Sequence, residues 1–207
     1  MSPIEKYHRD IEMGKVTADN EQALVVEHLQ SLWEALSQPG QKDRRIFKQL
    51  TNILPSKSVQ AKRPKGVYLW GGVGRGKTYL MDLLFDCVDR HDKLRTHFHR
   101  FMQWVHSELT LLQGEKNPLE KVAGKITAQT KLLCFDEFFV QDIGDAMILS
   151  GLFHALFERK IILVTTSNIH PDSLYENGLQ RQQFLPTIEL IKTNTNIVQI
   201  EPGTDYR

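Results

Sequence analysis

The chain has 207 residues, of which 41 % are hydrophobic, and its formal net charge is +1. This length and composition suit one globular domain, and the balanced charge provides no global field that would select nucleic acid as a partner. No apolar run approaches the roughly 18 residues that a membrane-spanning helix needs, and the polar start MSPIEKYHRD has no secretory signal. We therefore expect a cytoplasmic protein without an integral membrane segment.

The first predicted element is a helix over residues 19–36, which Asp19 begins as its N-cap. Apolar residues recur along this segment at spacings of four, three and four, which places them on one helix face. These residues are Val25, Leu29, Leu32 and Leu36. The predicted helix therefore has an apolar stripe that packs against another part of the protein.

The next segment, residues 37–65, contains three prolines and one glycine, and its part from residue 42 onward has eight Lys or Arg against one Asp. We predict a basic linker around a short helix at residues 46–54. Such a run of charge is typical of a solvated surface. The alternative is a docking surface for an acidic protein, nucleic acid or anionic lipid.

From Gly66 onward, short strand-like runs alternate with segments that have helical periodicity. The strand-like runs are residues 67–70, 94–98, 132–135, 161–165 and 197–200. This alternation is typical of an α/β fold, in which a parallel sheet is covered by helices on both faces and binds ligands at the carboxyl ends of its strands. We therefore predict a five-stranded parallel sheet between helices.

A glycine-rich string, GGVGRGKT, follows the first predicted strand and precedes a helical run at residues 79–90. In a P-loop of this spacing, main-chain N–H groups cradle phosphate oxygens at a helix N-terminus. The string consists of Gly71, Gly72, Val73, Gly74, Arg75, Gly76, Lys77 and Thr78. We expect these residues to bind ATP or ADP, with Lys77 at the β- and γ-phosphates and the Thr78 hydroxyl on Mg²⁺.

Two carboxylates, Asp136 and Glu137, follow the third predicted strand, in the string KLLCFDEF. Because this strand end lies at the same sheet edge as the P-loop, we expect Asp136 to hold the Mg²⁺ shell and Glu137 to polarise the attacking water. The fourth strand leads into the string TTSN, so Asn168 is a candidate sensor of the lytic water or the γ-phosphate. The alternative for Asn168 is a residue that only begins the next turn.

The string HFHRFMQWVH contains His97 and His99, which we place on one face of the second predicted strand. Two such histidines invite a metal-site interpretation, but no cysteine or clustered carboxylate accompanies them. In the same string, Phe101, Trp104 and Val105 recur at helical spacing, which favours packing in the core.

Five strings carry a resemblance to a known family: GVYLWGGVGRGKTYLMDLLFD, THFHRFMQWVHSELTLLQG, LLCFDEFFVQDIGDAM, TTSNIHPDSLYENGLQRQQFLPTIELIK and the final DYR. They resemble the Afg-one-like ATPases of the AAA+ class, over nearly all of the chain from Gly66 onward. The resemblance implies an AAA+ P-loop core that hydrolyses ATP and remodels a protein partner. The bacterial branch of this family associates with the FtsZ ring during cell division. The absence of a transit peptide favours that branch over the mitochondrial one.

The resemblance also implies how the chain is organised. We expect residues 1–65 to form an N-terminal helix and a basic linker, and residues 66–207 to form the ATPase core. Members of the family continue past the DYR string with a helical lid, so we expect the amino-terminal part of a longer protein. The complete protein is expected to be a hexamer-type homo-oligomer recruited to the division site, and this chain alone is expected to be mostly monomeric.

Two further roles are implied by the resemblance. In AAA+ assemblies, the helix before the last strand faces the nucleotide of the neighbouring subunit, so Arg181 is a candidate arginine finger supplied in trans. The alternative for Arg181 is a surface residue paired with Glu176. Arg75 and Arg100 are weaker candidates for the finger. AAA+ translocases also grip substrate with an aromatic loop after the second strand, a role open to Phe101 and Met102 if they do not pack in the core.

Two functional classes remain open. One is an ATP-driven enzyme that remodels a protein partner, which we expect to be FtsZ. The other is a nucleotide-dependent switch, an adaptor or loader with little turnover. Glu137 favours the enzyme, because a switch needs no catalytic acid. A third class, a small-molecule P-loop kinase, would need an acceptor pocket and an arginine-rich lid, and the sequence shows neither.

Overall fold

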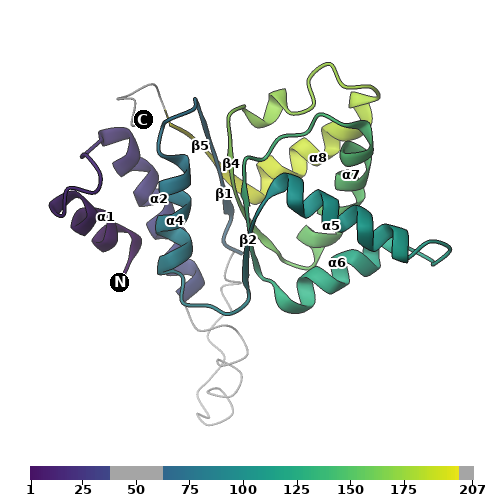
Figure 1. Ribbon diagram of the computed structural model, residues 1–207, viewed down its shortest axis with the longest axis horizontal. Coiled ribbons are helices and arrows are strands. Elements are labelled where there is room, and N and C mark those ends of the chain that lie inside the picture. Colours follow the sequence, from purple (N-terminus) through teal and green to yellow (C-terminus); the bar gives the residue numbers. More distant parts are fainter. Residues whose placement is uncertain (38–62, 201–207) are drawn as a thin grey trace, which may run out of the picture.

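The computed structural model describes residues 1–37 and 63–200 of the chain. Its centre is a five-stranded parallel sheet in the order β2-β3-β4-β1-β5, with helices on both faces (Figure 1). The strands are β1 (Gly66–Gly71), β2 (Lys93–His97), β3 (Leu132–Asp136), β4 (Ile162–Ser167) and β5 (Thr195–Ile200). The predicted five-stranded parallel sheet between helices is therefore confirmed.

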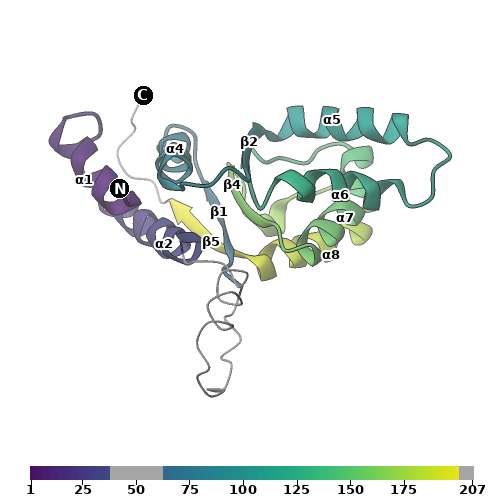
Figure 2. The same cartoon turned by 90° about the horizontal axis from the view of Figure 1, so that it is seen from below.

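The helices form two layers, one on each face of the sheet (Figure 1, Figure 2). One layer consists of α1 (Pro3–Glu12), α2 (Asn20–Ser37) and α4 (Lys77–Cys87). The other consists of α5 (Phe98–Leu111), α6 (Pro118–Gln129), α7 (Ile143–Glu158) and α8 (Arg181–Asn194), with the 3-10 turn η1 (Pro171–Ser173) before α8. The predicted helix at residues 46–54 lies outside the described residues. Among residues 1–37 and 63–200, no helix has both the length and the apolar character needed to cross a membrane.

Both faces of the sheet are buried, and each has its own hydrophobic core. In β1, Tyr68 belongs to the core under α5, α6, α7 and α8, whereas its neighbours Val67 and Leu69 belong to the core under α1, α2 and α4. Consecutive strand residues point to opposite faces, so a strand that is covered on both faces must be apolar throughout. Each fully buried side chain of this kind contributes about 1.5–3 kcal/mol to folding. This explains the continuous apolar runs of β1 and β3, whereas the edge strand β2 is only partly buried and is more polar.

The N-terminal helices pack into the same unit. Helix α1 was not expected from the polar start of the chain, but a capping box explains it: Ser2 N donates to Glu5 Oε2 at 2.8 Å, and Glu5 N donates to Ser2 Oγ at 3.4 Å. The predicted helix at residues 19–36 is α2, and Asp19 Oδ1 accepts from Glu21 N at 2.7 Å before its first turn. Both helices contact α4. The domain division between residues 65 and 66 stays a prediction.

A substitution at Gly66 tests how closely β1 approaches β4. A Cβ atom at Gly66 would overlap the main-chain oxygen of Leu163, so we expect Gly66→Ala to lower the free energy of unfolding by about 3 kcal/mol or more. Gly124 lies inside α6, and an added Cβ meets no atom within 4 Å. Gly124→Ala should therefore raise the free energy of unfolding by about 1 kcal/mol, because alanine favours a helix. Urea unfolding followed by circular dichroism measures both, and equal stability of the two variants would contradict the close approach.

Candidate active site

The glycine-rich segment between β1 and α4 leaves main-chain N–H groups open to a ligand. Gly74 and Gly76 have φ values of 80° and 77°, in the left-handed region that favours glycine. Gly76 is the N-cap of α4 and, having no side chain, leaves the N–H groups of the first turn uncapped. Uncapped donors at a helix N-terminus carry partial positive charge and attract anions. The segment predicted to be a P-loop, residues 71–78, therefore has a local geometry that suits phosphate.

Lys77, the first residue of α4, turns back over this segment. Its Nζ donates to the carbonyl oxygens of Gly71 at 2.7 Å and Gly72 at 2.5 Å. Burial, and then the nearby positive charge of Arg75, lower the pKa of the Lys77 ammonium from its ordinary value. A phosphate anion at this point would offset both effects, which fits the role predicted for Lys77.

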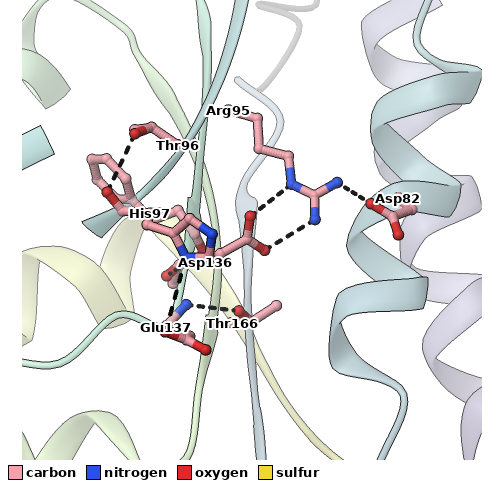
Figure 3. A network of polar contacts seen from close by, with 9 residues as sticks. Asp82, Arg95, Thr96, His97, Asp136, Glu137 and Thr166 are labelled. Carbon is pink, nitrogen blue, oxygen red and sulfur yellow. Dashed lines mark hydrogen bonds and ion pairs between the residues drawn. The ribbon is translucent and has the colours of Figure 1, made fainter. Parts of the chain in front are cut away.

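Asp136 ends β3 and is held by Arg95 of the neighbouring strand β2 (Figure 3). Arg95 Nε donates to Asp136 Oδ2 at 2.7 Å and Nη2 donates to Oδ1 at 3.2 Å, while Nη1 donates to Asp82 of α4. Asp136 is only 7 % exposed, so the guanidinium offsets a buried negative charge. Burial alone would lower the pKa of Arg95, but its hydrogen bonds to Asp136 and Asp82 raise it overall. Arg95 therefore stays charged and fixes the orientation of Asp136.

Sequence analysis missed Arg95 as a site residue. The signal was a charged side chain within a predicted strand, two residues before a histidine. Its meaning depends on strand pairing: β2 runs parallel to β3, with Arg95 level with Cys134 and His97 level with Asp136. Because residues two apart on a strand share a face, this register brings Arg95 within reach of the carboxylate at the end of β3.

Glu137 follows Asp136 with its main chain tied to β4. Its φ of 56° is left-handed, which is uncommon for a residue other than glycine and recurs at functional sites. Glu137 N donates to Thr166 Oγ1 at 3.1 Å, and Phe138 N donates to the Thr166 carbonyl at 2.7 Å. The Glu137 side chain is 83 % exposed, with Oε2 3.8 Å from His97 Nδ1. The turn is thus held rigidly while the carboxylate stays accessible.

A cavity of about 1060 Å³ opens beside Glu137. Its walls come from the first turns of α5, the connection between β3 and α7, and the segment after β4. Glu137 and the exposed side chain of Asn168 both line it, so the structure brings these two predicted residues together. Another part of the lining is a hydrogen-bonded pair, since His106 Nε2 lies 2.7 Å from Asp145 Oδ1. Sequence analysis showed no pocket here, because its walls come from three separate segments.

The structure corrects the assignment of the histidines to one strand face. Strand β2 ends at His97, and His99 lies in the first turn of α5, so the two do not share a strand face. No group of three or more metal-ligating side chains occurs among residues 1–37 and 63–200. Phe101 and Met102 are 4 % and 1 % exposed and belong to the core, and the Phe101 ring lies 4.6 Å from that of Phe135. Their interpretation as a substrate-gripping loop is therefore wrong.

Arg181 begins α8, which lies on the opposite face of the sheet from α4 (Figure 1). Its Nη2 donates to the main-chain oxygen of Asp172 at 2.5 Å, rather than to Glu176. Arg181 is not one of the residues that line the cavity beside Glu137. Within the described part of one chain, the structure does not bring Arg181 to the other predicted site residues, so its role in trans stays a prediction.

Thr78 and Asp136, the residues predicted to hold Mg²⁺, lie at the start of α4 and at the end of β3. A Mg²⁺ ion keeps several waters and takes few protein ligands, so these two side chains suffice for it. Thr78 is exposed at the start of α4. The Asp136 carboxylate accepts hydrogen bonds from Arg95 and keeps further lone pairs for water or metal. Both residues therefore fit the ion.

The chain is similar to proteins of one ATPase family along its whole length. A sequence model of the AFG1-like ATPases matches residues 1–207. The chain is 44 % identical over 211 residues to the cell division protein ZapE of Escherichia coli strain K12, covering 100 % of this chain and 56 % of that protein. It is 43 % identical over 155 residues to lactation elevated protein 1 homolog B of Danio rerio, covering 70 % and 31 %. The chain thus spans little more than half of the first relative and less of the second.

Among solved structures, the chain is similar to AMPPCP-bound DnaA from Aquifex aeolicus. The TM-score is 0.58 at 16 % identity, over 92 % of this chain and 50 % of that one. At so low an identity, the likeness shows the fold alone, and it agrees with the α/β sheet described above.

The pair of Arg95 and Asp136 yields a test of the site's architecture. We expect Arg95→Met to lower the free energy of unfolding by about 3–5 kcal/mol, because it leaves a buried carboxylate without its cation. The double variant Arg95→Met with Asp136→Asn should be less destabilised than the sum of the two single variants, since no buried charge then remains unpaired. Urea unfolding of the four proteins gives the coupling energy.

Arg159→Met is the matched control. Arg159 contacts Glu120 on the surface, where an ion pair contributes little to stability, so we expect a loss of about 1 kcal/mol or less. Additive effects of Arg95→Met and Asp136→Asn would show that the two side chains do not interact as described.

Proposed function

The chain belongs to the AFG1-like ATPase family, and from this premise we propose that it binds ATP with Mg²⁺ and hydrolyses it at the carboxyl edge of its sheet. One observation carries the proposal. The glycine-rich loop follows β1, Asp136 ends β3 with Glu137 directly after it, and Asn168 follows β4, which pairs with both of those strands. These residues therefore share one edge of the sheet, which supports a single catalytic site.

Phosphate binding begins at the N-terminus of α4. The uncapped N–H groups of its first turn bind phosphate oxygens, and Lys77 Nζ exchanges the carbonyls of Gly71 and Gly72 for them. This exchange is favourable because a hydrogen bond between two charged groups is stronger than one to a neutral carbonyl. Thr78 and Asp136 would hold Mg²⁺, which would supply positive charge to the phosphates and the leaving group.

Arg95 is a positioning residue in this mechanism. It donates to both oxygens of Asp136 and also contacts Asp82, so it anchors the end of β3 to α4 (Figure 3). Because the anchor joins the strand that bears Asp136 to the helix that begins with Lys77, the two halves of the site keep a fixed separation. Such preorganisation lowers the reorganisation needed during the reaction.

Glu137 is the proton acceptor in this mechanism. Its carboxylate is exposed while its main chain is held by Thr166, so it accepts a proton from a water placed beside the γ-phosphate. Asn168 lines the same cavity, and its amide donates to the water or to the γ-phosphate. His97, 3.8 Å from Glu137, helps to orient the carboxylate.

We further propose that the activity serves a protein partner in cell division, and that this partner is FtsZ. The proposal is supported by 44 % identity to a protein named for its part in cell division, and by the resemblance of the sequence to the bacterial branch of the family. Steady-state ATP hydrolysis measured with and without FtsZ tests it. We expect FtsZ to change the turnover rate, and an unchanged rate together with no detectable complex would contradict the choice of partner.

A nucleotide-dependent switch with little turnover is the second candidate. The observation that favours it is the place of Arg181, on the opposite face of the sheet from α4 and outside the cavity that Glu137 lines. An isolated chain would then bind nucleotide without this arginine and hydrolyse it slowly. The two following experiments separate the candidates.

Glu137→Gln should separate nucleotide binding from hydrolysis. An amide keeps the shape of the side chain but takes no proton from water, so we expect kcat to fall by about 10²–10³-fold and the dissociation constant for ATP to change little. Lys77→Ala should instead weaken ATP binding by at least about 10-fold, because a charge-assisted contact is lost. Glu158→Gln, an exposed carboxylate on α7, should change neither. Normal turnover in Glu137→Gln would remove Glu137 from its role and favour the switch.

A mixing experiment tests Arg181 as a finger supplied in trans. At concentrations where subunits associate, Arg181→Ala should bind ATP normally but hydrolyse it at least about 10³-fold more slowly. Mixing it with inactive Lys77→Ala should restore part of the activity, because an intact P-loop then faces an intact arginine. Arg159→Ala, which also alters a partly exposed arginine, should retain full activity. If turnover per subunit is constant over a dilution series in which the protein stays monomeric, the assignment in trans is wrong.

A further inference from the structure

Gln22, in the first turn of α2, lies against the P-loop. The residue is only 2 % exposed, although glutamine is usually a surface residue. Its Nε2 lies 2.7 Å from the position that a Cβ atom at Gly76 would occupy. A Cβ atom at Gly76 would therefore force the Gln22 amide to shift, in addition to straining the left-handed φ. The Gln22 amide lies directly against the start of α4.

The amide of Gln22 is not satisfied by the protein around it. Oε1 is buried and has no hydrogen-bond partner among residues 1–37 and 63–200. A buried acceptor without a partner costs about 1–3 kcal/mol, so a site of this kind needs an explanation. An apolar side chain of similar size, such as methionine, would fill the same space without that cost. The amide is therefore better explained by a ligand than by packing.

Helix α2 holds Gln22 firmly in place. Asp19 Oδ1 accepts from Gln22 N at 3.3 Å, and Tyr7 Oη both donates to the Asp19 carbonyl at 3.2 Å and accepts from Asp19 N at 3.3 Å. Further along α2, Val25 and Leu29 are buried in the core shared with α4, and α2 lies beside α4 (Figure 1, Figure 2). The amide is thus presented to the P-loop by a packed helix with a fixed cap.

We propose that Gln22 reads the adenine base of the bound nucleotide and sets the preference for ATP over GTP. The inference rests on the proposed nucleotide site at residues 71–78, since a triphosphate held there leaves its base outside the loop, where α2 packs. Adenine offers an acceptor, N7, next to the amino donor on C6, and a glutamine amide matches this pair with its own donor and acceptor. Guanine offers two acceptors, N7 and O6, at the same edge. The Gln22 amide then makes one of the two hydrogen bonds and leaves Oε1 facing an acceptor.

Binding measurements with four nucleotides test the assignment directly. In the wild-type chain, we expect GTP to bind about 10-fold or more weakly than ATP. We expect 7-deaza-ATP and purine riboside triphosphate each to bind about 10-fold more weakly than ATP, because each of them forms one hydrogen bond fewer. Gln22→Met should bind ATP about 100-fold more weakly, because both hydrogen bonds are lost, and should weaken GTP binding by no more than about 10-fold. It should also no longer distinguish ATP from 7-deaza-ATP. Dissociation constants from competition against a fluorescent nucleotide supply these values without any measurement of turnover.

Stability of the nucleotide-free protein gives a second, independent measurement. Because Gln22→Met removes a buried polar group that has no partner, we expect its melting temperature to equal or exceed that of the wild type. A purely structural amide predicts a lower melting temperature. Gln30→Met is the matched control on the same helix: Gln30 contacts Ile4 and Glu34 rather than the P-loop, so its nucleotide affinities should stay unchanged.

The possible outcomes separate the inference from the proposed function. If the wild type binds no nucleotide, the proposed function fails and the inference fails with it. If the wild type binds ATP and GTP equally, or if Gln22→Met weakens both to the same extent, the nucleotide site stands but Gln22 does not read the base. The nucleotide analogues decide the question on the wild-type chain even if Gln22→Met does not fold.

Discussion

The parallel pairing of β1, β4 and β3 is the constraint on which the rest of the structure depends. Because all three strands run in one direction, their carboxyl ends meet at one edge, and the residues that follow each strand meet there as well. The glycine-rich loop, the two carboxylates and Asn168 come from segments that are far apart in the sequence. Pairing alone places the end of β3, which bears Asp136, and the end of β1, which leads to Lys77, on the two sides of β4.

A buried charge makes this arrangement rigid. Asp136 is largely buried and balanced by Arg95, which reaches Asp82 on α4 with the same guanidinium. An ion pair of this kind adds little to stability compared with an apolar replacement, but breaking one partner is costly. Its value here is geometric, because it joins the edge strand β2, the strand that bears the acids and the helix that begins at the P-loop.

The N-terminal helices pack into the same unit as the helix that follows the glycine-rich loop. They complete the core on one face of the sheet, and α2 directs Gln22 at Gly76. A helix that is packed this tightly holds a polar side chain in a position that a loop would not fix. The opposite layer, by contrast, surrounds the cavity that Glu137 and Asn168 line. The layer of α1, α2 and α4 therefore contacts the P-loop, and the layer on the other face of the sheet contributes to the cavity.

The sequence by itself determined the local features of this protein. The P-loop string, the strand ending in Asp136 and Glu137, and the apolar stripe of α2 depend on spacing within short segments, where periodicity reveals the backbone conformation. Only the tertiary structure decided the strand order, the cation that holds Asp136, and the contact of Gln22 with Gly76. Each of these joins segments distant in the chain, and local spacing does not specify which partner a strand or helix packs against. The roles inferred for Arg95 and Gln22 therefore rest on tertiary contacts, which the sequence pattern does not show.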